Sequence, residues 1–242
     1  MFDPFFHIHH LCEVDSTNDR AKELARQGAP EGTLIVAETQ RAGRGRRGRS
    51  WSSPHGGLYF SLILRPPIPP EYASQLVVVT AASLYRALHR RSLPVSLKWP
   101  NDLVAGGKKL AGILVEGGFA SQGLSFAVVG VGVNVNGQPP IEGATSIEAL
   151  TASPQGKEEI LQDILGEMKA GYLAYLAEGI EPALADYRRG CITLNREVII
   201  IGPEGKARAK AIDVGSRGEL LVEYPDGCRR LVFADEVSLR TC

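Results

Sequence analysis

The sequence predicts an α/β (α+β) protein in two parts: a larger part over residues 1–190 and a small β-barrel over residues 191–242. In the larger part, helically spaced apolar residues alternate with short strand-like apolar runs. After Cys191 the pattern changes to short strand-like runs, at 196–201, 207–214, 220–224 and 229–233, separated by glycine-containing turns. Short strands joined by tight turns are typical of a small barrel.

The N-terminal segment predicts a strand, a helix and a second strand. Residues 5–14 have the alternating faces of a strand. Ser16, with Asp19 three residues later, precedes helically spaced apolar residues, which is typical of a capping-box helix start, and Gly28 ends that helix. Residues 33–37 are a short, strongly apolar strand.

A long loop over residues 38–57 interrupts this regular pattern and is rich in glycine and arginine. Long ordered loops in compact domains are usually functional. The later elements of the larger part are predicted as strand 58–64, connector 66–70, buried helix 71–91, strand 95–99, a hairpin with its second arm at 108–116, strand 124–135, amphipathic helix 157–177 and short helix 181–189.

Composition and charge exclude several classes of protein. Lys plus Arg and Asp plus Glu are 27 each, so the net charge is zero and a protein that coats nucleic acid is not expected. No apolar stretch is long enough to span a membrane, and residues 1–10 do not resemble a signal peptide. Cys12, Cys191, Cys228 and Cys242 fit no zinc spacing, so we expect free thiols in the cytoplasm. The histidines at 7–10 belong to the predicted strand, and no protein metal site is expected there.

The segment from Gly43 to Trp51 carries the most specific signal. It matches the Gly-x-Gly-x-x-Gly pattern, but residues 52–57 cannot start the helix that a dinucleotide fingerprint needs. Arginine–glycine runs also bind RNA, although zero net charge and a single such run argue against that role. The remaining interpretation is an anion-binding loop that closes on a ligand, with backbone N–H groups and forked guanidinium donors.

Three further segments are candidates for a binding site. Residues 98–102 place Asn101 and Asp102 at a strand end, although Pro-Asn-Asp is also an ordinary turn. Residues 109–116 combine Lys109 with a strand that is apolar on both faces, which suggests a ligand with a negative group, unless the lysine reaches solvent. On this strand Gly112 suggests a close approach to the backbone. Asn134 lies among valines and needs a hydrogen-bonding partner, which a structural contact would supply equally well.

Together these segments resemble the biotin protein ligase family, in the family's order and approximate spacing. The matching segments are 16–18, 37–40, 43–51, 98–102, 109–116 and 130–134. The resemblance implies a class II synthetase-like catalytic domain, with a mixed sheet flanked by helices, followed by a C-terminal SH3-like barrel. Bifunctional members carry an N-terminal helix-turn-helix domain, but here the catalytic pattern begins almost at Met1, so we expect no DNA binding.

The resemblance implies an ATP-dependent ligase. It would activate biotin as biotinyl-5'-AMP with Mg²⁺ present, and then transfer biotin to a lysine of a biotin carboxyl carrier protein. A lipoate or octanoate ligase or transferase of the same fold is the alternative, and the polar set Ser16, Thr17 and Gln40 favours the ureido group of biotin over lipoate. A homodimer formed through sheet edges is an expectation from the resemblance alone.

The expected site residues follow from this resemblance and from the chemistry of their side chains. Catalytic roles are expected for Arg46, Lys109 and Asp102. Biotin contacts are expected from Ser16, Thr17, Asn18, Gln40, Arg44, Gly45, Arg46, Lys109 and Gly112. ATP contacts are expected from Arg46, Arg49, Trp51, Asn101, Lys109 and Asn134. Mg²⁺ is expected on phosphates and water, with no all-protein metal site.

Overall fold

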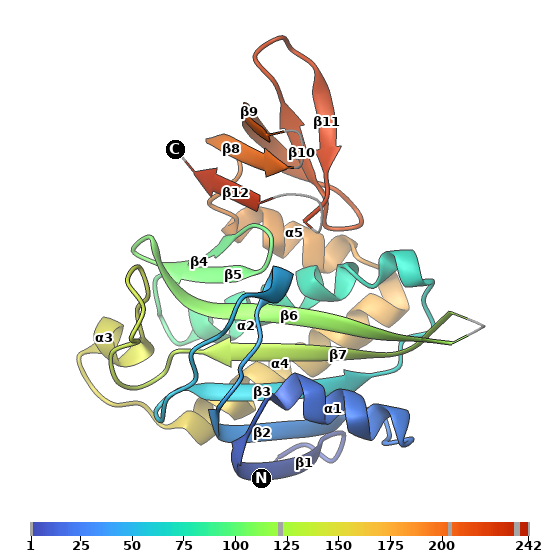
Figure 1. Cartoon of the computed structure of the whole chain (residues 1–242), viewed down its shortest axis with the longest axis vertical. Helices are drawn as coiled ribbons and strands as arrows, with labels where there is room; N and C mark the ends of the chain where they lie inside the picture. The colour runs from blue at the N-terminus through green and yellow to red at the C-terminus, as the bar shows by residue number, and fades with distance from the viewer. Residues whose placement is uncertain (1, 121–122, 203–204, 235–237, 242) are drawn as a thin grey trace.

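A computed structural model describes residues 2–120, 123–202, 205–234 and 238–241. Its main layer is a seven-stranded sheet in the order β1-β2-β3-β7-β6-β5-β4 (Figure 1). The strands are β1 (His7–Val14), β2 (Thr33–Gln40), β3 (Leu58–Leu64), β4 (Val95–Lys98), β5 (Asp102–Ala105), β6 (Lys108–Ala120) and β7 (Gly123–Val133). The pair β1–β2 is parallel and the other neighbours are antiparallel, which confirms the mixed sheet.

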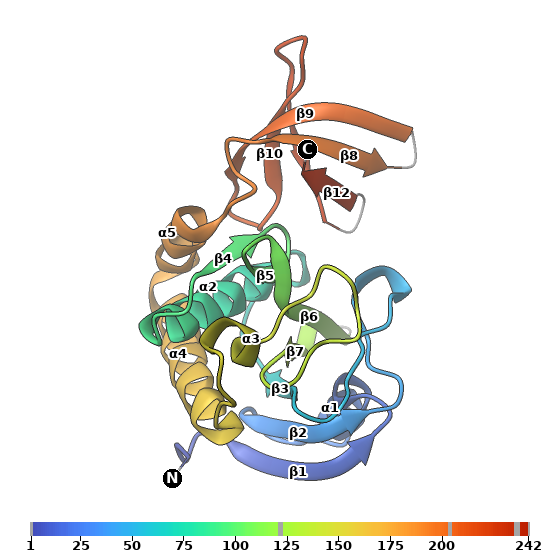
Figure 2. The ribbon, with the colours of Figure 1, turned by 90° about the vertical axis from the view of Figure 1, so that its left-hand side faces the viewer.

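Helices cover both faces of this sheet (Figures 1 and 2). They are α1 (Thr17–Arg26), α2 (Gln75–Arg90), α3 (Ile147–Thr151), α4 (Lys157–Glu178) and α5 (Glu181–Gly190). Ala21 and Ala25 of α1 pack on Ile35 of β2, whereas the neighbouring Leu34 and Val36 belong to the core that contains α2 and α4. Alternate residues of a strand point to opposite faces, so α1 lies on one face and the other long helices lie on the other.

The start of α1 confirms the predicted cap. The Ser16 hydroxyl accepts a hydrogen bond from the Asp19 N–H at 3.4 Å, and Ser16 is buried. This bond satisfies one of the N–H groups that a helix start leaves unpaired. Thr17 and Asn18 form the first turn and are also buried, so the cap fixes the position of two buried polar side chains.

The segment predicted as a loop over residues 38–57 is more regular than expected. Strand β2 continues to Gln40, a short 3₁₀ helix η1 (Arg46–Gly48) follows, and isolated bridges join Gln40 to Ser53 and Arg44 to Ser50. These pairings are between residues in different parts of the segment, so local propensity gives no sign of them. The helix predicted from residue 71 begins at Gln75, after a separate 3₁₀ turn, η2 (Pro70–Tyr72).

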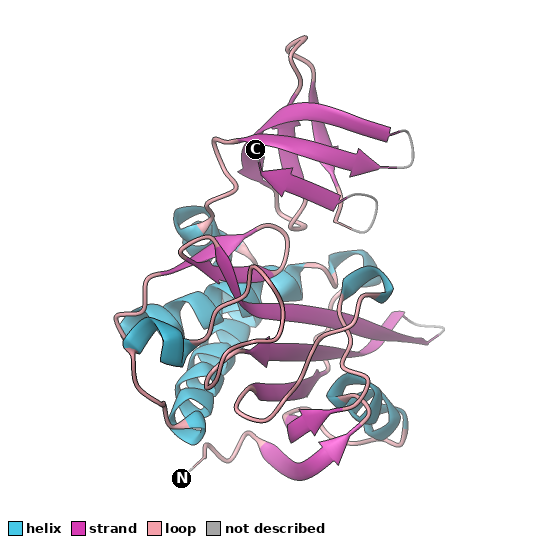
Figure 3. Cartoon of the chain, turned by 60° about the vertical axis from the view of Figure 1, so that its left-hand side comes forward, coloured by secondary structure: helices cyan, strands magenta, loops and turns pink. Residues whose placement is uncertain are grey.

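A separate antiparallel sheet follows α5. It lies beside the edge of the large sheet that is formed by β4 and β5 (Figure 3). Its strands are β8 (Glu197–Gly202), β9 (Gly205–Val214), β10 (Leu220–Glu223), β11 (Arg229–Val232) and β12 (Ser238–Thr241), in the order β11-β10-β9-β8-β12. Strand β12 and helix α3 were not predicted, because they have only four and five residues and therefore little periodicity. The SH3-like topology and the boundary at residue 191 stay predictions.

The helices show no membrane-spanning candidate. Within the described residues, no helix combines the length and the apolar character needed to cross a bilayer.

Candidate active site

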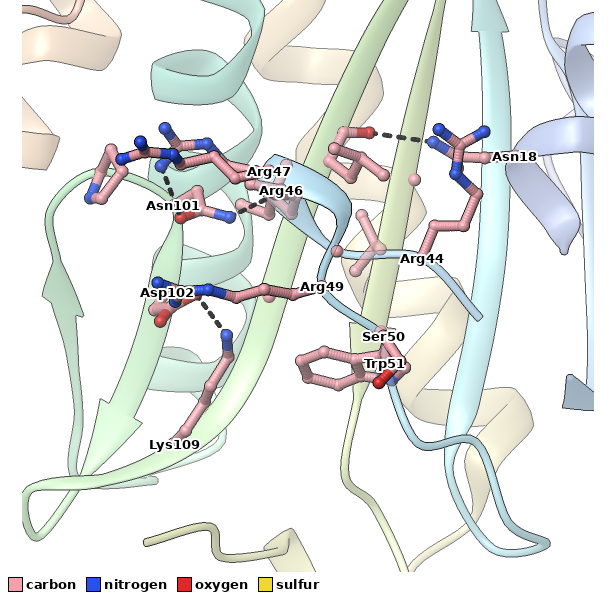
Figure 4. Close-up of a pocket in the computed structure, with 18 of the residues that line it drawn as sticks. Asn18, Arg44, Arg46, Arg47, Arg49, Ser50, Trp51, Asn101, Asp102 and Lys109 are labelled. Atoms are coloured by element: carbon pink, nitrogen blue, oxygen red, sulfur yellow. Dashed lines mark hydrogen bonds and ion pairs between the residues drawn. The ribbon is translucent and has the colours of Figure 1, made fainter. Parts of the chain in front are cut away.

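A cavity of about 260 Å³ opens over the middle of the large sheet (Figure 4). Four parts of the chain line it: the first turn of α1, the segment from Gln40 to Trp51, the turn over residues 98–102, and the central strands β6 and β7. With the exception of Asn134, every site residue expected from the sequence lines this cavity. The fold thus brings together segments that are far apart in the sequence.

One end of the cavity carries short polar side chains. The Gln40 Oε1 atom accepts hydrogen bonds from the backbone N–H of Thr17 at 2.8 Å and from its hydroxyl at 3.1 Å. The Gln40 amide nitrogen donates to the Ser53 hydroxyl at 2.8 Å. These contacts lock the amide orientation, so this end offers a fixed pattern of donors and acceptors to a ligand.

Asn18 is held by bonds within the protein. Its side-chain oxygen accepts from the Ser61 hydroxyl at 2.6 Å, and its nitrogen donates to Glu116 Oε2 at 2.9 Å. A Cβ atom on Gly130 would lie 1.9 Å from this oxygen, so β7 needs a glycine here. Asn18 therefore forms part of a rigid wall. Its supporting residues are Ser61, Glu116 and Gly130, and the sequence assigned no role to any of the three.

Trp51 explains the glycines of the central strands. Cβ atoms added to Gly112 and Gly132 would lie 2.9 and 2.5 Å from the indole ring. The close approach that the sequence suggests at Gly112 is made by the indole, and Gly112 also lines the cavity. Because the ring lies directly on these two backbones, its position is set by β6 and β7.

The other end of the cavity is charged. Lys109 Nζ lies 2.7 Å from Asp102 Oδ1 and 5.1 Å from the centre of the Trp51 ring. The Lys109 side chain is 38% exposed, which agrees with the alternative that this lysine reaches solvent. The hairpin of β5 and β6 supplies a carboxylate partner and leaves the ammonium open to the cavity, as Figure 4 shows.

Arg46 connects the loop to two other parts of the chain. Its guanidinium donates to Asn101 Oδ1 at 3.3 Å and to the carbonyl oxygen of Ala234, just after β11. Asn101 in turn donates to the Ile113 carbonyl at 2.6 Å. Arg46 therefore lies over the turn that carries Asn101 and Asp102.

Arg44 points to the opposite end of the cavity, near Asn18 (Figure 4). It lies 2.6 Å from Asp19 Oδ1 and 3.2 Å from Glu116 Oε1. The hydrogen bond to Asp19 raises the pKa of the Arg44 guanidinium. In this structure Arg44 anchors the loop to α1 and β6.

The summed charge around the cavity is strongly positive. Of the described residues that line it, six are cations and one, Asp102, is an anion. The cations are Arg44, Arg46, Arg47, Arg49, Lys98 and Lys109. Such a site attracts negatively charged ligands and stabilises negative charge that develops during a reaction.

A second cavity of about 270 Å³ adjoins the first, and Trp51 and Lys109 border both. Asn134 lines this second cavity, where its nitrogen donates to the Thr145 carbonyl at 3.0 Å and so holds the nearby segment 139–144. The Trp51 Nε1–H is buried and has no partner, which leaves one donor for a ligand. Sequence reasoning missed segment 139–144, whose only signal is its glycine and proline content.

Known proteins match both the sequence and this arrangement. The model of the biotin/lipoate A/B protein ligase family matches residues 11–134. The chain belongs to this family. Within the biotin/lipoate ligase family, the bifunctional ligase/repressor BirA of Bacillus subtilis is 33% identical over 95% of this chain and 73% of that protein. The biotin--[acetyl-CoA-carboxylase] ligase of Paracoccus denitrificans is 36% identical over 94% of this chain and 98% of that protein.

The fold is shared with solved structures of this family. The biotin protein ligase from Aquifex aeolicus in complex with biotin and ATP aligns with a TM-score of 0.84 at 31% identity. The alignment covers 98% of this chain and 99% of that chain, including the C-terminal sheet. The family and the fold predicted from the sequence are therefore confirmed.

Proposed function

We propose that this protein is a biotin protein ligase, which uses ATP to activate biotin and joins it to a lysine of an acceptor protein. The observation that carries the proposal is the pair of adjoining cavities. The first is lined mainly by cationic side chains, and Trp51 and Lys109 border both. Two anionic reactants can meet at such a junction. The relatives named as biotin ligases and the Aquifex structure with biotin and ATP support the same assignment.

The polar end of the first cavity suits the ureido group of biotin. Ser16, Thr17 and Gln40 present short polar groups whose positions are fixed by their mutual hydrogen bonds. With the ureido group there, the biotin carboxylate points toward Lys109 and Arg46. The adenine of ATP would then occupy the second cavity, beside the Trp51 indole and its free N–H donor.

In the first step the biotin carboxylate attacks the α-phosphorus of ATP, forming the C(O)–O–P linkage of biotinyl-adenylate and releasing pyrophosphate. The main obstacle is repulsion between two anions, which fixed cations lower. We assign Lys109 and Arg46 to the carboxylate and the α-phosphate, and Arg49 to the departing phosphates. Asp102 orients the Lys109 ammonium through their 2.7 Å contact.

Mg²⁺ enters with ATP as part of the substrate and offsets charge on the phosphates. The described residues contain no group of three or more His, Cys, Asp and Glu side chains placed to hold a metal ion. We therefore assign the ion to phosphates and water.

In the second step the amine of the acceptor lysine attacks the acyl carbon, the C–O bond to the phosphate breaks, and AMP leaves. The amine must lose a proton, and Asp102 is the one carboxylate among the described residues that line the first cavity. We propose Asp102 as the group that orients this amine or accepts its proton. The acceptor is the carrier domain of a biotin-dependent carboxylase.

The deciding test is exchange of labelled pyrophosphate into ATP with Mg²⁺, measured with and without biotin. This half-reaction needs no acceptor protein. We expect exchange that requires biotin and is not supported by lipoate or octanoate. Exchange supported by lipoate would assign the chain to the lipoate branch of the family, and folded protein without exchange for any of these acids would overturn a ligase function.

Arg46→Gly is expected to weaken retention of biotinyl-adenylate, because the loop loses its contacts to Asn101 and Ala234. We expect release of the adenylate to be roughly tenfold faster or more, because a hydrogen bond made by a charged group contributes at least about 1.5 kcal/mol. We also expect more labelling of lysines on bystander proteins. Arg41→Gly is the matched control, because Arg41 lies in the same segment and pairs with Asp15 outside the cavity. Equal bystander labelling by the two variants would contradict the role of Arg46.

Other features of the proposal come from the sequence analysis. We propose that the enzyme works in the cytoplasm, since Cys12, Cys191 and Cys228 are free thiols as expected in a reducing compartment. The absence of DNA binding, the homodimer and the SH3-like domain over residues 191–242 remain predictions.

A further inference from the structure

The turn that carries Asn101 and Asp102 is fastened from outside the large sheet by three hydrogen bonds. The Trp99 backbone N–H donates to the Thr193 hydroxyl at 3.0 Å, and the Trp99 indole N–H donates to the Gly218 carbonyl at 2.9 Å. The Tyr187 hydroxyl donates to the Pro100 carbonyl at 3.0 Å. The three partners come from α5, from the segment before β8 and from the turn between β9 and β10.

The side chains that make these contacts are buried. Tyr187 and Thr193 are each 1% exposed and Trp99 is 3% exposed. The backbone nearby is joined as well, since the Ile192 N–H donates to the Leu97 carbonyl at 2.9 Å. A buried hydrogen bond cannot be replaced by water without disturbing its surroundings, so these bonds fix the turn against α5 and the C-terminal sheet.

The same turn also lines the charged end of the cavity, where the proposed reaction takes place. Next to Pro100, Asn101 holds Arg46 and the Ile113 carbonyl, and Asp102 holds Lys109. Burial raises the pKa of Tyr187, with smaller contributions from Cys191 and Asp102, while Arg46 acts in the opposite direction. The Tyr187 hydroxyl, bonded to Pro100, is thus adjacent to the residues that carry Asn101 and Asp102, although Tyr187 does not line the cavity.

We propose that Tyr187 is a positioning residue for adenylate formation: by holding the Pro100 carbonyl, it sets the places of Asn101 and Asp102, and through them those of Arg46 and Lys109. This inference rests on the proposed function, because its readout is the biotin half-reaction. Tyr187 touches no substrate. Thr193 acts on the same turn through the Trp99 N–H, one peptide away from Pro100.

Tyr187→Phe removes one hydroxyl and keeps the ring, so it tests the hydrogen bond alone. We expect kcat for biotin-dependent pyrophosphate exchange to fall roughly fivefold or more, because small displacements of catalytic groups are costly. The KM for biotin should change less than about twofold, because Ser16, Thr17 and Gln40 hold the ureido end of biotin far from this turn. Arg46 and Lys109 act on the carboxylate mainly as negative charge develops in the reaction, so their displacement lowers kcat more than it raises KM.

Tyr172→Phe is the matched control. Tyr172 is 3% exposed and its hydroxyl donates to Glu31 Oε1 at 2.6 Å, outside the cavity. Loss of a hydrogen bond to a carboxylate lowers the free energy of unfolding at least as much as loss of one to a carbonyl. If loss of stability alone were the cause, Tyr172→Phe would lower kcat as much as Tyr187→Phe, and we expect it to leave kcat unchanged.

Three outcomes decide the matter. A fall in kcat with Tyr187→Phe but not with Tyr172→Phe supports the proposal; equal kcat values for both variants, or a change in the KM for biotin alone, overturn it. Should Tyr187→Phe not fold, Thr193→Val takes its place and must give the same split between kcat and KM. Absence of exchange in the wild-type protein would overturn the proposed function itself, a result distinct from an active wild type with an unaffected variant.

Discussion

Lys109→Ala is expected to lower biotin-dependent exchange of pyrophosphate into ATP by about 10²-fold, equivalent to roughly 3 kcal/mol of lost transition-state stabilisation. Lys109 borders both cavities and lies where the carboxylate and the α-phosphate would meet. Its ammonium is held by Asp102 before the substrates arrive. The charge is therefore preorganised, and water cannot substitute for it in the variant.

Lys108→Ala is the control for Lys109. Lys108 is the adjacent residue of β6 and is exposed, and it lines neither cavity. It should retain wild-type exchange, and both variants should show the same far-ultraviolet circular dichroism. Wild-type exchange by folded Lys109→Ala protein would contradict the assignment of this lysine to the reacting groups.

Gly132→Ala is expected to lower kcat/KM for ATP by between about tenfold and 10²-fold, as for a displacement of about an ångström at a reactive site. The added Cβ would lie 2.5 Å from the Trp51 ring, and the indole must move to relieve this contact. Trp51 borders both cavities, so its displacement changes the proposed adenine site directly. Steady-state kinetics at varied ATP, with biotin saturating, measures the effect.

Gly166→Ala is the control for Gly132. Gly166 lies inside α4, and an added Cβ there meets nothing within 4 Å. Alanine favours a helix over glycine by about 1 kcal/mol, so this variant should be at least as stable as the wild type and equally active. An unchanged kcat/KM for ATP in Gly132→Ala would show that the position of Trp51 does not govern nucleotide use.

The sequence by itself determined the elements whose signals are local. The cap at Ser16, the strand at 58–64 and the turn between β5 and β6 depend on side chains only a few residues apart, and the structure has them where the sequence predicts them. Family membership was also readable, because the segment 43–51 and the other motifs keep their order along the chain.

Only the tertiary structure decided which groups of the site meet. Arg46 reaches Ala234 across 188 residues and Asn18 reaches Glu116 across 98, while Trp51 fills the space above Gly112 and Gly132. The placement of Asn134 in a second cavity likewise depends on the segment 139–144 folding back beside Trp51. Periodicity and turn chemistry describe interactions between near neighbours in the chain. Contacts between distant segments are set by packing and burial of the whole sheet, which a local pattern does not encode.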